Sequence, residues 1–367
     1  MAETRRKDNA FEYASNAVRL SGRQWLIVAG LSLAAMVVPP LVWPAFEPLE
    51  LVDGYRIPYE LSDDYWRLER VIDAGAGSPA GAVVLGDSVA WGQFVRNDRT
   101  LSHYLDDDSG TAVVNLGVDG LHPAAMEGLV RHYGGSLRND KTLVLLNLSW
   151  MSDPQHDLST PGEARFNHPG LVRQFADSPP AYKAEFGDRL SRVAARYIPL
   201  LPWREHVQTA YYERMSVYDW TLRRPYRCPF APLAEAPPGP TVEPHVEPTD
   251  WRSRGLAPAD FDWVDAERSY QWAMFRRMLE LLRSRENDVL VVVSPFNRHM
   301  LTEAGRAGHD RLLKGTISWF EANNISYITL TTLPSDEYAD ASHPLAAGYE
   351  RLAKELRASA EYREWMK

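Results

Sequence analysis

The sequence predicts an α/β protein in which helices cover both faces of a parallel β-sheet. Strand-like and helix-like segments alternate along the 367 residues, and the strand-like segments are short, nearly continuous apolar runs. Strands buried on both faces of a parallel sheet have this composition, whereas strands with one wet face alternate apolar and polar residues. The five expected strands are GAVVLG (81–86), TAVVNLG (111–117), KTLVLLNLSW (141–150), DVLVVVSP (288–295) and ISYITL (325–330).

Amphipathic segments between and after these strands predict the covering helices. The clearest of them has apolar side chains at helical spacing, namely Trp272, Phe275, Met278, Leu279 and Leu282. The other expected helices are the segments 62–75, 100–110, 122–137, 309–324 and 345–365. Ligands of open parallel sheets bind at the carboxyl ends of the strands. Polar residues that directly follow the expected strands are therefore the candidates for a functional site.

The alternation is interrupted between about residues 151 and 262, which we interpret as an insertion between the third and fourth strands. Seven prolines fall between Pro229 and Pro248, so this part is not expected to form regular structure. Two or three helices rich in aromatic residues and arginine are expected before it. Their aromatic side chains suit sugar rings and could form one wall of an active site. Packing, or a surface for a membrane-proximal partner, is an equally good interpretation.

An apolar segment near the N-terminus predicts a membrane anchor. The 22 residues from Trp25 to Phe46 carry no charge, and at about 1.5 Å per helical residue they span about 33 Å, close to the thickness of a bilayer core. Pro39 and Pro40 would end or kink the helix and leave a run nearer the length of a signal-peptide core. However, no small-residue pair stands at a suitable cleavage position. An uncleaved signal anchor is therefore favoured over a signal peptide or a buried core helix.

Charged residues before this segment predict its orientation. Five basic residues precede or begin it, and the positive-inside rule then keeps the N-terminus in the cytoplasm and the body on the extracytoplasmic, periplasmic side. These residues are Arg5, Arg6, Lys7, Arg19 and Arg23. The expected organisation is a cytoplasmic tail (1–23), a transmembrane anchor (24–46), a juxtamembrane connector (47–78), and an α/β domain in two parts (79–150 and 263–367) that flank the insertion (151–262).

Composition excludes several classes of function. The formal net charge is −9, and no basic stripe with interleaved aromatic residues occurs in the body of the chain, so nucleic acid is not an expected partner. Cys228 is the only cysteine, which excludes an internal disulfide and a cysteine-based zinc cluster. No other metal-binding pattern is evident.

The stretch AVVLGDSVAWGQF (82–94) places Ser88 directly after the first expected strand. Gly-Asp-Ser is common in surface turns and says little by itself. At the end of a buried strand, however, a sharp turn presents the serine Oγ at the edge of the sheet. A serine that attacks an acyl carbon also needs a base, a group that orients the base, and hydrogen-bond donors for the oxyanion.

Candidates for the base are histidines that follow an aspartate by three residues. This pattern occurs three times, so spacing alone does not select one: Asp119 with His122, Asp153 with His156, and Asp340 with His343. Context favours Asp340 and His343, because they lie between the fifth strand and the terminal helix, where a loop reaches the carboxyl edge of the sheet. Asp340 could instead be a helix N-cap. His122 and His156 are more typical of loop residues.

Several other residues near the same edge are candidates for binding. Gly117, after the second strand, could offer a backbone N–H to an acyl oxygen, and Asn147 after the third strand could offer a side-chain amide. Trp91, Arg298 and His299 are weaker candidates for substrate contact. Exposed Arg and His side chains are ordinary in loops.

Three blocks of the sequence resemble the SGNH (GDSL-like) hydrolase superfamily: VVLGDSVAWG, then TLSHYLDDDSGTAVVNLGVDG, then DASHPLAAGYERLAKEL, in the family's order and about its spacing. The resemblance covers roughly 79–150 and 287–367. It implies a flavodoxin-like three-layer α/β/α sandwich with Ser88 as nucleophile, His343 as base and Asp340 as its orienting group.

The same resemblance implies an oxyanion hole formed by the N–H of Ser88, the N–H of Gly117 and an asparagine side chain, here Asn147. The third block departs from the family, because the chain has NLSWMSD in place of Gly-x-Asn-Asp. Ser149 is therefore an alternative donor, or the hole has one donor fewer.

The resemblance implies a serine esterase or O-acyltransferase that forms an acyl-enzyme without a cofactor. The layout is similar to that of membrane-anchored SGNH proteins that work beside membrane-bound O-acyltransferases, so O-acetyl groups of a cell-surface polysaccharide are the expected substrate and such a transferase is an expected partner. The alternative is a non-catalytic binding or scaffold protein on an inactivated SGNH fold in a membrane-associated assembly, which the altered third block favours.

Overall fold

A computed structural model describes residues 20–76, 81–106, 112–160, 162 and 166–367. The chain divides into two compact units at the bond between Glu47 and Pro48.

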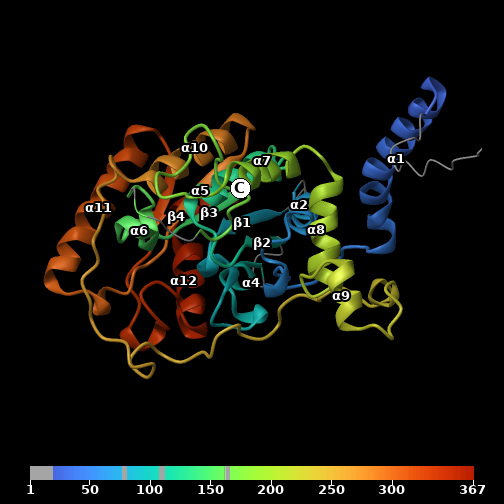
Figure 1. The fold of residues 1–367 in the computed structure, drawn as a ribbon. Coiled ribbons are helices and arrows are strands. Elements are labelled where there is room, and N and C mark those ends of the chain that lie inside the picture. The colour runs from blue at the N-terminus through green and yellow to red at the C-terminus, as the bar shows by residue number, and fades with distance from the viewer. Residues whose placement is uncertain (1–19, 77–80, 107–111, 161, 163–165) are drawn as a thin grey trace, which may run out of the picture. The chain divides into compact units, whose positions relative to one another are not determined.

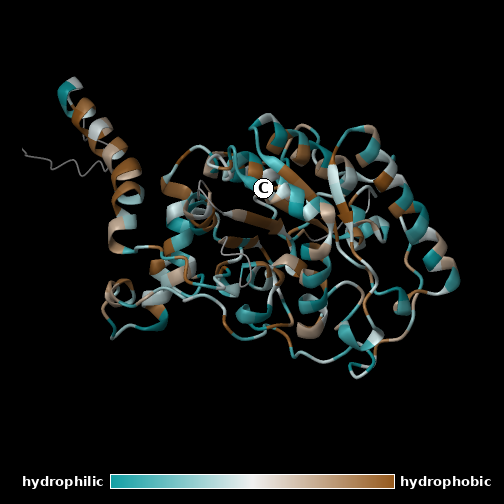
Figure 2. Cartoon of the chain, turned by 180° about the vertical axis from the view of Figure 1, so that it is seen from behind, coloured by the Kyte–Doolittle hydropathy of each residue, from teal (hydrophilic) through white to brown (hydrophobic). Residues whose placement is uncertain are grey.

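The N-terminal unit contains one long helix, α1 (Gly22–Phe46). A capping box begins it, in which Ser21 N–H donates to Gln24 Oε1 and Gln24 N–H donates to Ser21 Oγ. The helix has 25 residues and is apolar along most of its length (Figure 2). Among the described residues, α1 alone is long and apolar enough to cross a membrane. A membrane anchor and a signal sequence share this length and composition.

Prolines do not end α1 where the sequence suggested. Pro39, Pro40 and Pro44 all lie inside the helix, which continues to Phe46. Each proline removes only the hydrogen bond of its own nitrogen, so prolines near the C-terminal end cost the helix few bonds. The expected cytoplasmic tail lies outside the described residues up to Arg19, together with the basic residues Arg5, Arg6 and Lys7, and the orientation of α1 stays a prediction.

The C-terminal unit is built on a five-stranded sheet in the order β2-β1-β3-β4-β5, with all neighbours parallel (Figure 1). Each strand lies within its expected segment, so the predicted parallel sheet is confirmed. The strands are β1 (Ala82–Gly86), β2 (Val113–Gly117), β3 (Lys141–Leu146), β4 (Asp288–Val293) and β5 (Ser326–Thr329). β3 is shorter than expected, because Asn147 caps a 3₁₀ helix, η3 (Leu148–Met151), directly after it.

Helices cover both faces of the sheet, as the sequence predicts. Side chains alternate along each strand, so that Val83 and Leu85 of β1 enter one hydrophobic cluster and Val84 enters another. The first cluster is completed by α2 (Tyr65–Gly75), α5 (Pro123–His132), α10 (Tyr270–Ser284) and α11 (Glu303–Ala322). The second is completed by α4 (Leu101–Asp106), α12 (Ala346–Ala358) and α13 (Ala360–Trp365). The result is a three-layer α/β/α sandwich.

Hydroxyl caps explain two differences between the expected and the observed helices. α11 begins at Glu303, six residues before the expected start at 309, because the Thr302 Oγ1 accepts the Gly305 N–H at 3.2 Å. The expected terminal helix is divided in two at Ser359, whose Oγ accepts the Tyr362 N–H at 3.1 Å and starts α13. The end of the helix expected at 100–110 lies outside the described residues.

The insertion contains three longer helices, as expected. They are α7 (Phe186–Ala195), α8 (Leu200–Tyr211) and α9 (Val217–Arg223), after a short α6 (Pro154–Asp157). α8 packs on α2 and on η1 (Tyr59–Leu61), next to the layer that contains α2. α2 itself contributes to the main core, so the expected connector 47–78 is largely part of the compact body.

The proline-rich part of the insertion forms only one short 3₁₀ helix, η4 (Ala231–Ala234). A fully buried arginine, Arg56, holds the end of this part against the body. Its guanidinium donates to the carbonyl oxygens of Thr241 at 2.7 Å, Glu243 at 2.7 Å and Gly92 at 2.5 Å. Burial lowers the pKa of Arg56 to about 10, a value at which the side chain remains charged at neutral pH.

Candidate active site

Ser88 begins a short helix, α3 (Ser88–Trp91), directly after β1. Asp87 caps this helix, because its Oδ1 accepts the Val89 N–H at 2.9 Å. Gly86 makes the close turn possible, since a Cβ at this position would lie 2.7 Å from the Cβ of Ala90. Ser88 therefore stands at the carboxyl edge of the sheet, with 7% of its surface exposed.

The structure brings His343 and Asp340 to Ser88. The Ser88 Oγ lies 2.8 Å from His343 Nε2, and His343 Nδ1 lies 2.9 Å from each carboxylate oxygen of Asp340. The Asp340 Oδ1 also accepts the backbone N–H groups of Ser342 at 2.9 Å and of His343 at 3.0 Å. A carboxylate that receives Nδ1–H leaves Nε2 free to accept the serine proton.

A residue from another loop supports this arrangement. Asn297, which follows β4, donates its side-chain amide to the Asp340 carbonyl at 2.9 Å and its backbone N–H to the Ala341 carbonyl at 2.8 Å. The loop that presents Asp340 and His343 is thus attached to the carboxyl end of β4.

The other two aspartate–histidine pairs have different surroundings. His122 is buried between Gln271 and the Asn167 carbonyl, 3.1 Å from His122 Nε2. His156 pairs with Asp153 at 3.0 Å and is largely exposed. Within the part of the chain that the structure describes, His343 alone of these three histidines is hydrogen-bonded to Ser88.

Burial and charge oppose each other in the Asp340–His343 pair. Burial tends to raise the pKa of Asp340, but the charge and hydrogen bond of His343 and two backbone N–H donors lower that pKa to about 2. Burial tends to lower the pKa of His343, but the Asp340 carboxylate, with smaller effects from Asp87 and Asp119, raises that pKa above the ordinary 6.5. Asp340 is therefore ionised at neutral pH and holds a proton on the imidazole.

This electrostatic arrangement predicts the pH dependence of any reaction that uses His343 as base. The base must be neutral, so kcat/KM should fall as the pH drops through the pKa of His343, with a midpoint above 6.5. Asp340→Asn removes the charge that raises this pKa, so the midpoint should move to lower pH and the maximal rate should fall about 10⁴-fold. A pH profile of ester turnover checks both; an unchanged midpoint in Asp340→Asn would contradict the pairing.

One of the expected oxyanion donors, the Gly117 N–H, is occupied by another acceptor, which corrects the sequence-based assignment, and the Asn147 amide is partly occupied. The Gly117 N–H donates to the Asn115 Oδ1 at 2.8 Å, and the Asn147 side-chain amide donates to the Asp87 Oδ2 at 2.8 Å. The Asn147 Oδ1 accepts the Ser149 N–H at 3.0 Å. The Gly117 N–H is thus not presented to a bound acyl oxygen, whereas the Asn147 amide has a second N–H besides the one that Asp87 receives, so Asn147 stays a candidate donor.

Two other backbone groups have no acceptor among the described residues, the N–H of Ser88 and the N–H of Gly120. Gly120 has a left-handed φ of +68° in the turn after β2. Its neighbour Asp119 is close enough to His343 for the two charges to affect each other's pKa. The Asp-Gly turn signal in the sequence could have indicated this left-handed turn.

Gly117 has a packing role that its backbone position explains. A Cβ on Gly117 would lie 2.4 Å from the Trp91 nitrogen and 2.6 Å from the Ala90 carbonyl carbon, so α3 would have to move. Gly117→Ala should lower the free energy of unfolding by about 1–3 kcal/mol. Gly135→Ala is a matched control, since a Cβ there meets nothing within 4 Å. Urea unfolding of both variants tests this, and equal stabilities would contradict the packing argument.

Asp87 has a structural role that the sequence did not indicate. It is fully buried, and its Oδ2 accepts the Trp150 Nε1–H at 2.8 Å as well as the Asn147 amide. Burial raises the pKa of Asp87, although the nearby His343 and these donors act against that rise. Asp87 thereby links the turn that carries Ser88 to the residues that follow β3.

The three weaker binding candidates are used by the protein itself. Trp91 is fully buried, with its Nε1–H donating to the Ile57 carbonyl at 2.9 Å and Arg56 over its ring at 4.4 Å. Arg298 pairs with Asp310 of α11, and the His299 Nε2 lies 3.1 Å from the Leu333 carbonyl. Trp91 is therefore a core residue, and Arg298 and His299 already have protein partners.

Phe94 lies between His343 and a pocket. The centroid of its ring lies 5.3 Å from that of the His343 ring. The Arg254 guanidinium lies over the Phe94 ring, 4.7 Å from its centroid. The pocket has a volume of about 660 Å³ and is lined by Phe94, Ala346 and residues 244–248. The proline-rich end of the insertion, and not its aromatic helices, thus lines the space beside the site.

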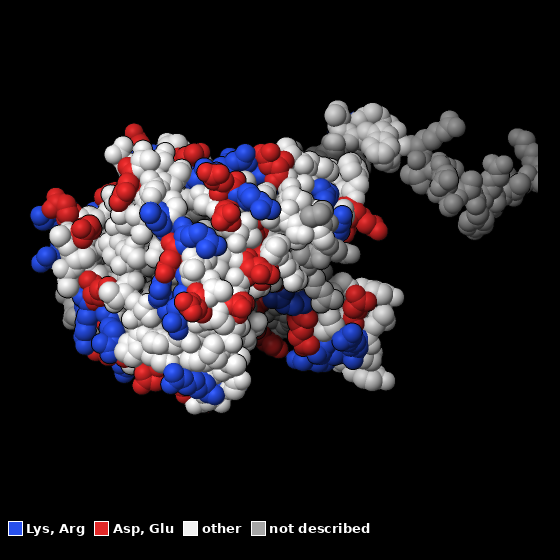
Figure 3. Space-filling view, turned by 90° about the vertical axis from the view of Figure 1, so that its left-hand side faces the viewer, with Lys and Arg blue, Asp and Glu red and all other residues white. Residues whose placement is uncertain are grey.

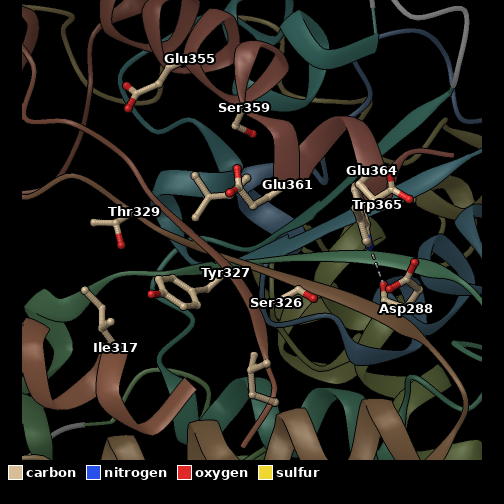
Figure 4. A pocket seen from close by; sticks show the side chains of 12 residues that line it. Asp288, Ile317, Ser326, Tyr327, Thr329, Glu355, Ser359, Glu361, Glu364 and Trp365 are labelled. Carbon is tan, nitrogen blue, oxygen red and sulfur yellow. Dashed lines mark hydrogen bonds between the residues drawn. The ribbon is translucent and has the colours of Figure 1, made fainter. Parts of the chain in front are cut away.

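A larger pocket of about 870 Å³ lies elsewhere, along the edge strand β5 (Figure 4). Its lining is acidic, with Glu355, Glu361 and Glu364 from the terminal helices, and the Trp365 Nε1–H donates to the Asp288 carbonyl at its border. It contains none of Ser88, His343 and Asp340. No group of three or more His, Cys, Asp or Glu side chains in the described segments could hold a metal ion.

The fold and the site define an α/β/α protein with a Ser-His-Asp arrangement at the carboxyl edge of its sheet. No protein-family model and no curated protein matches the chain. A candidate lipolytic protein of the G-D-S-L family from Desulfitobacterium hafniense DCB-2 is similar in structure, at a TM-score of 0.35 and 9% identity, over 75% of this chain and 96% of that one. At this distance the likeness says nothing about activity, and the function is argued from the site.

Proposed function

We propose that this protein is a serine esterase or O-acyltransferase that forms an acyl-enzyme on Ser88. The observation that supports this function is the continuous chain of hydrogen bonds from Ser88 Oγ through His343 to Asp340, at 2.8 and 2.9 Å. A nucleophile, its base and the group that orients the base are the parts that acyl transfer requires.

The reaction proceeds in two steps through one covalent intermediate. As Ser88 Oγ attacks the acyl carbon, His343 Nε2 takes the serine proton, and the oxyanion accepts hydrogen bonds from the N–H groups of Ser88 and Gly120. The imidazolium then gives its proton to the departing alkoxide. In the second step His343 deprotonates water or a sugar hydroxyl, whose oxygen attacks the acyl carbon. The bond to Ser88 Oγ then breaks, and the imidazolium returns its proton to that oxygen. Asp340 stabilises the imidazolium in both steps.

The acyl group that we favour is acetyl, carried as an ester on a cell-surface polysaccharide. Anchoring by α1 would place the body beside the envelope polymers, and the small exposed area of Ser88 suits a small acyl group better than a bulky one. A membrane-bound O-acyltransferase is the corresponding partner, as the source of acyl groups.

The full chain in detergent should release p-nitrophenol from p-nitrophenyl acetate and acetate from an O-acetylated polysaccharide. Brief acid quenching should trap an acetyl group on the peptide that contains Ser88. Addition of a deacetylated polysaccharide distinguishes transfer from hydrolysis, because only transfer yields an acetylated polymer. Absence of both turnover and the Ser88 adduct would favour a non-catalytic scaffold, the function that the occupied Gly117 N–H supports.

Anchoring by α1 gives a prediction about topology. With the N-terminus in the cytoplasm, protease added to intact spheroplasts should digest the body, and a tag placed before residue 20 should be protected until the membrane is lysed. Immunodetection of N- and C-terminal tags measures this. Protection of the C-terminal tag before lysis would show that the body lies on the other side.

A further inference from the structure

Exposed apolar side chains of the body concentrate in one part of the insertion. Among the described residues outside α1, nine of the thirteen large apolar side chains that face solvent lie between Phe186 and Phe230. Five of them belong to α9 and the segment that follows it, which we call the α9 surface: Val217, Tyr218, Leu222, Tyr226 and Phe230. Tyr226 is fully exposed, and Tyr218 and Phe230 are about 70% exposed. Such patches usually mark an interaction site.

The α9 surface is held in place from beneath. Trp220 on the inner side of α9 is buried and contacts Tyr212 edge-on, with ring centroids 5.7 Å apart. The Tyr212 hydroxyl donates to the Pro229 carbonyl at 2.8 Å, which holds the segment after α9. Ser216 caps the helix through the Asp219 N–H at 3.0 Å. The exposed side chains of α9 therefore belong to a helix that is packed and hydrogen-bonded on its inner side. Their exposure does not result from a poorly packed core.

Charge distinguishes this segment from the rest of the chain. Residues 216–230 contain three arginines, Arg223, Arg224 and Arg227, and one acidic residue, Asp219, a net charge of +2, whereas the whole chain has −9. Arg224 and Arg227 lie over the Trp220 ring at 5.0 and 5.7 Å and pair with Glu213 and Glu235, just outside this segment. Arg223 has no ion pair among the described residues, so its charge is the one that an anionic surface could meet.

We propose that the α9 surface rests on the anionic headgroup layer of the membrane that α1 spans. Tyrosine, phenylalanine and leucine beside arginine are the side chains that favour the interface between headgroups and acyl chains. A chain already tethered to the bilayer needs only weak affinity for such contact, because the tether keeps the surface at high local concentration. The proposal rests on anchoring by α1 and is independent of the catalytic proposal.

Cys228 provides a reporter within the α9 surface. It is exposed and is the only cysteine of the chain, so the full-length protein can be labelled there with an environment-sensitive nitrobenzoxadiazole dye. In nanodiscs of phosphatidylglycerol and phosphatidylcholine, the emission should shift to the blue and be quenched by lipids brominated near the glycerol. Both effects should weaken in discs of phosphatidylcholine alone, since Arg223 then has no anionic headgroup to pair with.

The matched control moves the same dye to a different part of the body. Cys228→Ser with Ser318→Cys places it on the exposed side of α11, which lies at the other end of the sheet from α9 (Figure 1). The face that contains α11 shows basic and acidic side chains interspersed (Figure 3). A dye at position 318 should show neither the shift nor the quenching.

A variant of the surface tests the contact directly. Tyr218→Ser, Leu222→Ser and Phe230→Ser combined, with the dye on Cys228, should lose the blue shift and the quenching, while ester turnover and far-ultraviolet circular dichroism stay as in the parent. Quenching at position 228 no greater than at 318, in protein that is recovered with the discs, would overturn the proposal and favour a protein partner. Failure of the full chain to incorporate into discs would overturn the anchoring, and this proposal with it, but not the esterase.

Discussion

Ser88→Ala is expected to lower ester turnover by about 10⁵-fold or more, because it removes the atom that forms the covalent intermediate. The variant should remain folded. Alanine fits at the first position of α3, and the hydroxyl makes one hydrogen bond, to His343, so its loss should change the free energy of unfolding by only about 1 kcal/mol. Release of p-nitrophenol and a thermal unfolding curve measure the two effects.

Ser149→Ala is the matched control for this experiment. Ser149 also follows a strand at the carboxyl edge, and its backbone N–H donates to Asn147. If its hydroxyl takes no part, turnover should stay near the parent value. A loss of about a hundredfold would instead assign the Ser149 hydroxyl to the oxyanion hole. Turnover by Ser88→Ala within tenfold of the parent would contradict the proposed nucleophile.

His343→Ala is expected to have an effect of similar size, because without the imidazole no group accepts the serine proton. A fluorophosphonate probe should no longer label Ser88, and added imidazole should restore part of the turnover if it enters the vacated space. His156→Ala is the better control, because the His156 side chain is largely exposed and its removal should disturb the fold less than removal of the buried His122.

Labelling of the three histidine variants distinguishes the three aspartate–histidine pairs. His156→Ala and His122→Ala should both be labelled as efficiently as the parent, provided that thermal unfolding shows them folded. The hydrogen bonds of His122 to Gln271 and Asn167 make some loss of stability expected in that variant. Labelling that survives in His343→Ala but disappears in either of the other two would reassign the base.

The fold was predictable because each of its strands can be recognised from a short stretch of sequence. Each strand is an apolar run whose alternate side chains enter two clusters, and burial on both faces leaves little choice of conformation. The placement of Ser88 followed from the same pattern, since a strand that ends in Gly-Asp-Ser must turn at the edge of the sheet. The choice of His343 required the order of elements along the chain, because Asp-x-x-His spacing alone fits three pairs.

The oxyanion donors were not predictable from spacing. Whether the Gly117 N–H is available depends on the rotamer of Asn115 on the same strand, and the orientation of the Asn147 amide depends on Asp87, which follows the neighbouring strand β1. Trp91 was misjudged for a related reason. A tryptophan in the turn after the nucleophile looks exposed in the sequence, but Arg56 and Ile57, from the segment expected to be a connector, enclose it.

Arg56 connects the irregular end of the insertion to the turn that follows Ser88. The Arg56 guanidinium donates to carbonyl groups of residues 241 and 243 and of Gly92. Shortening the chain around residues 241–243 would therefore leave a buried guanidinium beside Gly92 without most of its acceptors, which is destabilising. Relatives of this protein should therefore vary the length of the loop before this point far more freely than the loop at it. A segment without helix or strand is here as constrained as the sheet.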